Sequence, residues 1–282
     1  MRLRVQSVVP YLLGLPALVF MGVLFLLPVG FLISLSFFKP DDEGVLLFSL
    51  AAYQDIFSDP YNLAMIVRTI KISAITTIIS LVLAFPVALY LRQVSARTRA
   101  VISFILISPL LTSVVVRTLA WIILLSPKGI INSALIAVGL EPVKLLYNQV
   151  GVIIGLTHVF FGYMAISLMT SVIKIDENLL LAASNLGAKR FTILREILIP
   201  LSLPGILSGS ILVFTMSAST YATPMLLGGS ATKLMATEIY DQAVNYLDWQ
   251  SASALACVLL VCIALLVFIA GSLAERDGRR AA

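Results

Sequence analysis

The chain has 282 residues, of which 60% are hydrophobic and 12% are charged, and its formal net charge is +5. Soluble domains carry roughly 25% charged residues, so this composition excludes an ordinary water-soluble fold. The charges gather in clusters between long uncharged runs, and about 20 apolar residues cross a bilayer as a helix. The sequence therefore predicts an all-α membrane protein, one domain over residues 1–282, with six spans at about 11–38, 65–91, 100–125, 148–173, 201–227 and 249–274.

The first span follows Met-Arg-Leu-Arg, which resembles the charged start of a signal peptide. A signal peptide has an apolar region of only about 7–15 residues and ends in small residues before its cleavage site. The uncharged run Val5–Phe38 is much longer and ends in two bulky phenylalanines. We therefore interpret it as a retained transmembrane helix.

Two polar residues, one basic and one histidine, lie well inside predicted spans. Arg117 lies in the third span, where a charge costs roughly 2.5–3.5 kcal/mol. We expect it either to face a cavity or partner, or to snorkel or form a structural ion pair. His158 lies in the middle of the fourth span and either lines a solute path or is a buried, hydrogen-bonded packing residue.

The loop 174–200, after the fourth span, has helical periodicity. Its apolar residues predict a short amphipathic helix that Gly187 ends, because glycine accepts the left-handed conformation of a C-cap. A second apolar stripe begins at Phe191, and Pro200 is expected to terminate it. Such a helix pair is either a lever that another protein moves or a hairpin that rests on lipid headgroups.

The segments around the fifth span supply further candidates. Tyr221 and Thr223, near a glycine pair, are candidate gate residues. Beyond them, Glu238, Asp241, Asn245 and Asp248 fall within an arc of about 80° if the segment is helical. This face presents acids to a cationic solute or a binding protein, or is simply solvated.

Orientation follows from the Lys and Arg residues of the loops, which concentrate on the cytoplasmic side of a membrane. With the N-terminus inside, twelve lie inside and four outside, so both termini are expected to face the cytoplasm. The net positive charge then requires no nucleic-acid partner. Inside are Arg2, Arg4, Arg92, Arg97, Arg99, Lys174, Lys189, Arg190, Arg195, Arg276, Arg279 and Arg280; outside are Lys39, Lys128, Lys144 and Lys233.

The sequence lacks the GxxxxGK[ST] phosphate-binding loop, so any ATP-driven function needs a separate ATPase. Cys257 and Cys262 are five residues apart in the last span, and no His or Cys pair has zinc-site spacing. We predict neither a metal site nor catalytic residues. An intramembrane enzyme is disfavoured because the spans hold a single histidine and no carboxylate.

The loop 174–200 resembles the EAA loop of binding-protein-dependent ABC permeases, in which this segment is the coupling helix that fits a groove of the ATPase. The resemblance rests on Ala182-Ala183, Leu186-Gly187-Ala188, Phe191, Ile199-Pro200 and Pro204-Gly205-Ile206 with Gly209. Leu181 replaces the glutamate that this family carries before the two alanines, while Asp176 and Glu177 lie one turn upstream. The resemblance therefore implies ATPase-coupling roles for Asp176, Glu177, Ala182, Ala183, Leu186, Gly187, Ala188, Phe191 and Pro200.

Other segments are similar to the spermidine/putrescine permease family. They are Ser108-Pro109, Arg117-Thr118-Leu119-Ala120-Trp121, Gly129-Ile130-Ile131-Asn132 and the run Thr223–Gly229. The resemblance implies a type I importer permease of the bacterial inner membrane, in contact with lipid, with ATP and Mg bound by an ATPase dimer. It also implies a second homologous permease and a periplasmic binding protein as partners.

Polyamine is the expected cargo from this resemblance, but the spans contain no acid and the third contributes Arg117. An amino acid or a phosphonate-type solute therefore stays an alternative. An ion-coupled secondary transporter would be expected to show intramembrane acids or matching broken spans, and neither is evident.

Overall fold

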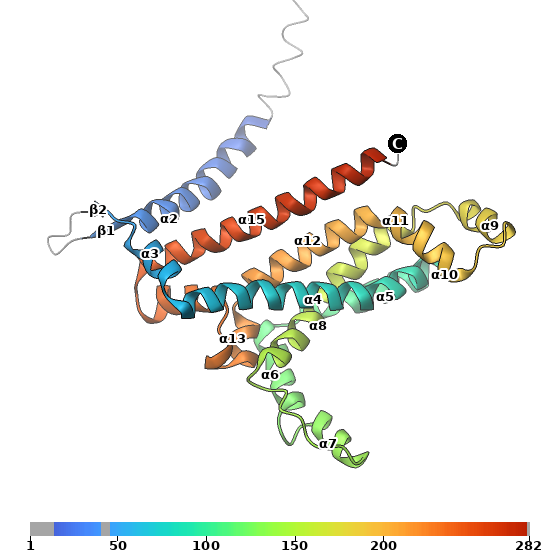
Figure 1. The fold of residues 1–282 in the computed structure, drawn as a ribbon, viewed down its shortest axis with the longest axis horizontal. Coiled ribbons are helices and arrows are strands. Elements are labelled where there is room, and N and C mark those ends of the chain that lie inside the picture. The colour runs from blue at the N-terminus through green and yellow to red at the C-terminus, as the bar shows by residue number, and fades with distance from the viewer. Residues whose placement is uncertain (1–13, 41–45, 281–282) are drawn as a thin grey trace, which may run out of the picture. The chain divides into compact units, whose positions relative to one another are not determined.

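The computed structural model describes residues 14–40 and 46–280 and is almost entirely helical (Figure 1). Residues 11–13 of the first predicted span, Arg2, Arg4 and the acids Asp41, Asp42 and Glu43 lie outside the described residues. Contacts divide the chain into two compact units. One contains the described residues up to Pro60 together with Ile239–Val258, and the other contains Tyr61–Glu238 and the described residues from Leu259 onward.

The first unit begins with a continuous apolar helix, Gly14–Phe37, which includes a π-helical turn at Gly22–Leu26 and α2 (Leu27–Phe37). Strands β1 (Phe38–Pro40) and β2 (Leu46–Phe48) form a short antiparallel pair with Phe38 opposite Phe48. Helix α3 (Ala51–Ser58) follows, and the Tyr53 hydroxyl donates to Ser36 Oγ at 2.8 Å. These contacts fix the C-terminal end of α2 within its own unit.

The remaining helices follow one another along the chain, most of them with short connections, and a longer loop joins α7 to α8. They are α4 (Pro60–Gln93), α5 (Ala96–Leu111), α6 (Val114–Leu125), α7 (Ile130–Ala137), α8 (Gln149–Val172), α9 (Glu177–Asn185), α10 (Arg190–Ile193), α11 (Ile199–Leu201), α12 (Leu203–Ser219), α13 (Ala222–Gly228), α14 (Met235–Tyr240) and α15 (Trp249–Arg280). Two π-helical turns, Leu194–Leu198 and Asp241–Asn245, and a 3-10 turn, Ser230–Thr232, complete the described elements.

Helix α8 forms the centre of the second unit, with Val152, Met164 and Leu168 fully buried. Glycines bring its neighbours close, since a small residue at a helix interface lets two backbones approach. A Cβ built on Gly205 of α12 would lie 2.6 Å from Ser171 Oγ, and one on Gly162 of α8 would overlap the Leu106 carbonyl oxygen of α5. Close packing on α8 therefore holds α5 and α12 in place.

Five helices are long and apolar enough to cross a membrane, or six if the bent pair Arg190–Leu201 and Leu203–Ser219 is one span. This confirms the all-α membrane class. Two predicted spans are wrong in detail because each contains a break of one or two residues. Thr112 and Ser113, with extended backbones, divide 100–125 into α5 and α6, and the extended Thr220 divides 201–227 between α12 and α13.

The arm formed by α6 and α7 extends away from α5 and α9 of the same unit (Figure 1). Asn132, which is 1% exposed, holds the loop that follows α7 against the end of α6. Its side-chain amide donates to the carbonyls of Ser126 and Val143 and accepts from Val143 N at 2.8 Å. Gly129 allows the turn into α7, since a Cβ there would lie 2.5 Å from the Ile123 carbonyl oxygen. The segment Gly129-Ile130-Ile131-Asn132 therefore has a structural role, since it forms the turn between α6 and α7.

Candidate functional site

The loop 174–200 begins with a capped helix. Asp176 is the N-cap of α9, and its Oδ1 accepts from Asn178 N at 2.9 Å. Glu177 occupies the first turn, where a negative charge is favoured by the helix dipole. Both acids are exposed. The two acids at the start of α9 are therefore explained by helix capping and by the helix dipole.

Gly187 ends α9 with a backbone that favours glycine. Its φ is +84°, its N–H donates to the Ser184 carbonyl and the next residue, Ala188, donates to the Ala183 carbonyl, both at 3.0 Å. These two bonds form a Schellman motif, which satisfies carbonyls at the helix end. The predicted helix and glycine turn are thus present in the structure.

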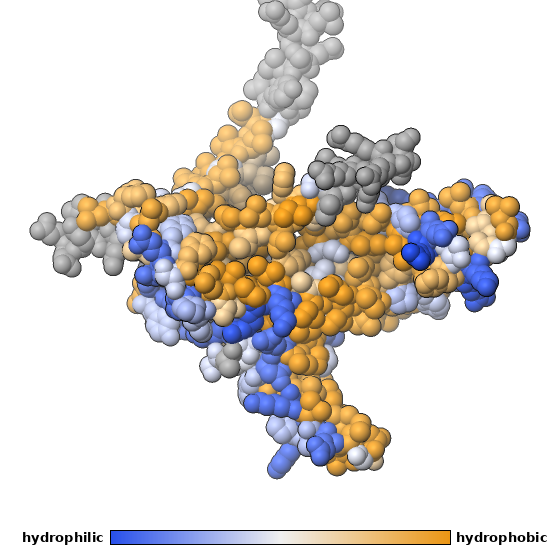
Figure 2. All heavy atoms as spheres, in the orientation of Figure 1, coloured by the Kyte–Doolittle hydropathy of each residue, from blue (hydrophilic) through white to orange (hydrophobic). Residues whose placement is uncertain are grey.

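Apolar side chains project from this loop. Leu186 is 89% exposed, Phe191 71% and Leu181 56%. In the region of Figure 2 that corresponds to α9 and α10 in Figure 1, hydrophobic and hydrophilic residues lie beside one another. Large apolar side chains grouped on one surface are typical of a protein contact.

The second half of the loop differs from the sequence prediction at Pro200. Helical backbone continues through the π turn and α11 to Leu201, and the chain bends by 65° before α12. Pro200 lies in α11, and the helical backbone passes through it, because the π turn directly before it already departs from the i→i−4 bonding that proline interrupts. The break comes at Ser202, directly before Leu203 and Pro204 of α12.

A cavity of about 350 Å³ opens within the second unit. It is lined by residues of four long elements and the start of α13: Leu110, Val114, Arg117, Val159, Phe160, Tyr163, Met216, Ser219, Thr220 and Thr223. Arg117 Nη1 donates to the Pro109 carbonyl in the last turn of α5. A helix end leaves such carbonyls without helical partners and favours a cation, so Arg117 both lines the cavity and closes α5.

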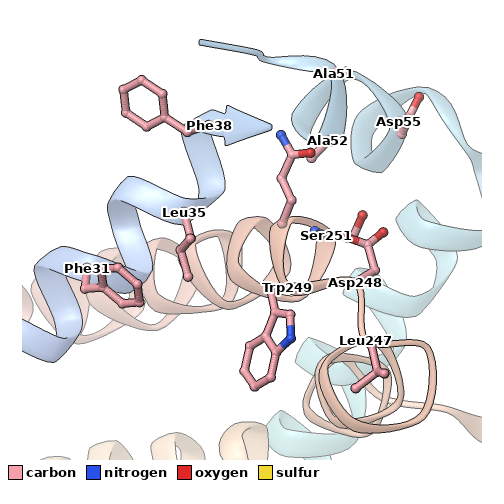
Figure 3. A pocket seen from close by; sticks show the side chains of 11 residues that line it. Phe31, Leu35, Phe38, Ala51, Ala52, Asp55, Leu247, Asp248, Trp249 and Ser251 are labelled. Carbon is pink, nitrogen blue, oxygen red and sulfur yellow. Dashed lines mark hydrogen bonds between the residues drawn. The ribbon is translucent and has the colours of Figure 1, made fainter. Parts of the chain in front are cut away.

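A second cavity, of about 780 Å³, lies within the first unit (Figure 3). Phe31 and Leu35 of α2 line one part of it, and Asp55 of α3 and Trp249 of α15 line others. Asp248 also borders it, but its Oδ1 accepts from Ser251 N at 3.0 Å and so caps α15. This cavity has no contribution from the loop 174–200.

Residues 73–277 match the family described as "Binding-protein-dependent transport system inner membrane component". The chain belongs to this family. The spermidine/putrescine transport system permease protein PotB of Escherichia coli K12 is 31% identical over 247 residues, covering 86% of this chain and 90% of that protein. The PotB protein of Haemophilus influenzae is 29% identical over 259 residues, 90% of each.

A solved structure shares the fold of this permease. A chain in the crystal structure of a bacterial alginate ABC transporter, in complex with an alginate pentasaccharide-bound periplasmic protein, has a TM-score of 0.78 and 18% identity. The match covers 96% of this chain and 95% of that one. The permease is therefore a multi-pass inner-membrane subunit of an ABC importer with the type I fold.

Of the residues predicted for the solute path, Arg117 and Thr223 line the cavity of the second unit. His158 of the permease does not; it is exposed, and its Nδ1 accepts from Trp121 Nε1 at 3.3 Å. Tyr221 is 43% exposed beside the cavity but outside its lining. The cavity also has Tyr163, Ser219 and Thr220, which sequence reasoning missed because nothing in their spacing marks the inner face of α8 or α12.

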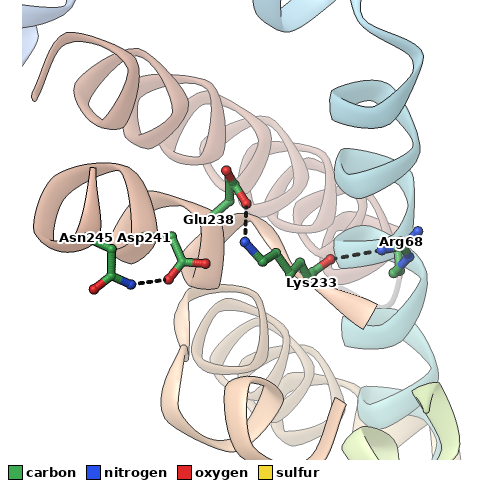
Figure 4. Close-up of polar contacts among 5 residues, drawn as sticks. All are labelled: Arg68, Lys233, Glu238, Asp241 and Asn245. Carbon is green, nitrogen blue, oxygen red and sulfur yellow. Dashed lines mark hydrogen bonds and ion pairs between the residues drawn. The ribbon is translucent and has the colours of Figure 1, made fainter. Parts of the chain in front are cut away.

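The predicted acidic helix face of the permease, with Glu238, Asp241, Asn245 and Asp248, is not formed as expected. Glu238 is 7% exposed and forms an ion pair with Lys233 at 3.2 Å, while Arg68 Nη1 donates to the Lys233 carbonyl (Figure 4). In the other unit, Asp241 is 9% exposed and accepts from Asn245 Nδ2 at 2.7 Å. The π turn and the break at Leu247 (φ +56°) replace the regular helix on which the arc was calculated.

Proposed function

We propose that this permease imports a polyamine of the spermidine or putrescine type, delivered by a periplasmic binding protein, by alternating access. The observation that carries the proposal is the 31% identity to a spermidine/putrescine permease over 86% of the chain. A second homologous permease forms the other half of the path, since one copy with six spans supplies only one coupling loop. Both termini face the cytoplasm, in agreement with the Lys and Arg count.

An ABC ATPase dimer drives transport by binding the loop 174–200 and supplies the sites for ATP and Mg. The proposal is supported by the exposed Leu186 and Phe191, whose burial in a groove removes large apolar surfaces from water. Ala182, Ala183 and Ala188 are small enough to let the α9 backbone approach a partner closely. Asp176, Glu177 and Pro200 act by shaping the two ends of the loop, and Gly187 fixes the angle between its helices.

The cavity supports an amine cargo through aromatic and hydroxyl groups. Phe160 and Tyr163 have ring centroids 6.4 Å apart on one side of it. Aromatic faces attract an ammonium group, and the Ser219, Thr220 and Thr223 hydroxyls accept hydrogen bonds from its N–H groups. These aromatic and hydroxyl groups therefore contact a polyamine in the cavity without a carboxylate from this permease.

Arg117 favours a second candidate cargo. Among the described residues that line the cavity, Arg117 is the one with a charged side chain. Its guanidinium presents several hydrogen-bond donors suited to a carboxylate or phosphonate. An amino acid or a phosphonate-type solute would gain this contact in the path.

Uptake by the complex in proteoliposomes tests both candidates. The complex is purified through a tag on this chain and supplied with its binding protein, with labelled spermidine, putrescine, an amino acid or 2-aminoethylphosphonate, with and without internal ATP. We expect ATP-dependent uptake of the two polyamines and none of the others. Uptake restricted to the amino acid or the phosphonate contradicts the polyamine proposal. ATP-independent uptake driven by an ion gradient contradicts the importer mechanism.

A further inference from the structure

Two arginines connect the start of the loop 174–200 to helices that are distant in the sequence. Arg92, in the last turn of α4, donates from Nη2 to the Ile175 carbonyl at 3.1 Å. Ile175 is 7% exposed and directly precedes Asp176, the N-cap of α9. Within the part of the chain that the structure describes, this is the hydrogen bond that joins α4 to the loop.

The second arginine extends this connection to α5. Arg99, in the first turn of α5, donates from Nε to the Leu91 carbonyl at 2.8 Å and from Nη2 to the carbonyls of Arg92 and Val94 at 3.3 and 3.4 Å. These carbonyls lie at the C-terminal end of α4, where helical partners are lacking and a cation is favoured. The ends of α4 and α5 are therefore held together by one guanidinium.

The covalent connections of the loop make the Arg92 bond mechanically important. The loop is continuous in the chain with α8 before it and with α12 after it, so a displacement of α9 reaches those two helices directly. Helices α4 and α5 come earlier in the chain and have no such covalent link, although α5 also packs against α8 at Gly162. Yet the cavity is lined by α5 as well as by α8 and α12, so its opening requires their movements to be coordinated.

The geometry points to Arg92 as a positioning residue that transmits movement of the loop 174–200 to α4 and, through Arg99, to α5. This inference rests on the proposed function, because it assumes that an ATPase moves the loop. A hydrogen bond from a charged donor is among the stronger ones in proteins, and its acceptor here is the carbonyl of Ile175, a residue that is 7% exposed. Loss of the bond leaves α9 free to move without taking α4 along.

The test measures solute taken up per ATP hydrolysed by the complex in proteoliposomes with its binding protein. Arg92→Ala is expected to lower this ratio about tenfold, while the ATPase still co-purifies and still hydrolyses ATP. Arg97→Ala removes a charge from the first turn of α5, where Arg97 is exposed, and is expected to leave the ratio within twofold. Arg92→Lys keeps a charged donor but has a single nitrogen with different geometry, and its ratio is expected to lie about two- to threefold below that of the wild type.

Each other outcome has a definite meaning. A ratio for Arg92→Ala equal to that of Arg97→Ala overturns the inference. So does loss of the co-purifying ATPase from Arg92→Ala alone, since Arg92 would then serve assembly. If Arg92→Ala does not reach the membrane, Arg92→Lys decides: a ratio about two- to threefold below that of the wild type supports the inference, and an unchanged ratio overturns it. Absence of any ATPase from the wild-type complex would instead contradict the proposed function.

Discussion

Gly187→Pro is expected to reduce solute uptake at least about tenfold while the permease still inserts and the ATPase still hydrolyses ATP. Proline fixes φ near −65° and has no N–H, whereas Gly187 has a φ of +84° and donates to the Ser184 carbonyl. An L-residue in this conformation costs about 1–2 kcal/mol and a lost hydrogen bond about 0.5–1.5 kcal/mol. A helix of nine residues such as α9 is marginal on its own, so its end should unfold.

The chain contains a closely matched control at Gly139, after α7. Its φ is +82°, its N–H donates to the Ile136 carbonyl at 3.0 Å, and Leu140 N donates to the Leu135 carbonyl at 2.9 Å. A Cβ at either glycine would meet open space. Gly139→Pro therefore imposes a very similar local change on the arm, and we expect it to keep uptake within about twofold. Equal losses of uptake in the two variants would show that Gly187 has no special part in coupling.

Gly162→Val is expected to destabilise the membrane domain itself. A Cβ at Gly162 would overlap the Leu106 carbonyl oxygen, and a backbone atom cannot rotate away as a side-chain end can. Overpacking typically costs about 1–3 kcal/mol, and we expect the upper end here. At roughly 2–4 °C per kcal/mol for a large domain, the midpoint of thermal denaturation in detergent should fall by about 6–12 °C.

The control for this variant is Gly271→Val in α15. A Cβ at Gly271 has nothing within 4 Å. This substitution therefore also replaces a helical glycine with valine, but without any overlap. Its midpoint is expected to stay within about 2 °C of the wild type, on the same scale. A midpoint for Gly162→Val that matches the control would mean that α5 and α8 do not pack as closely as described.

The spans were predictable because length and hydropathy are properties of about 20 residues taken together. The breaks at Thr112–Ser113, Ser202 and Thr220 involve one or two residues, and hydropathy averaged over a span does not register them. Pro109 and Pro204 lie close to two of these breaks, but Pro86 lies inside the unbroken α4. Proline alone therefore does not predict where a membrane helix ends.

The loop 174–200 was predictable because its signals are local: an acidic N-cap, helical periodicity and a glycine at the C-cap. The cavity was not predictable from the sequence, because Tyr163, Ser219 and Thr220 come together only through the packing of α8 against α12. Arg117 drew attention by its charge, but its bond to Pro109 depends on the break that turns α6 back toward the end of α5. Glu238 and Asp241 were misplaced because the periodicity of a regular helix does not hold through the π turn.

Photo-crosslinking from Leu186→Cys tests most directly whether an ATPase binds the loop 174–200. Cys257 and Cys262 are first replaced by serine, and a cysteine is introduced at Leu186 or, as a control, at Val138, which is 72% exposed on the arm. The cysteine is labelled with a maleimide that carries a photoactivatable group. After illumination of native membranes, Leu186→Cys is expected to crosslink to a nucleotide-hydrolysing protein, whereas Val138→Cys is not. If Leu186→Cys forms no crosslink to a nucleotide-hydrolysing protein in membranes where this chain supports uptake, that result contradicts the account.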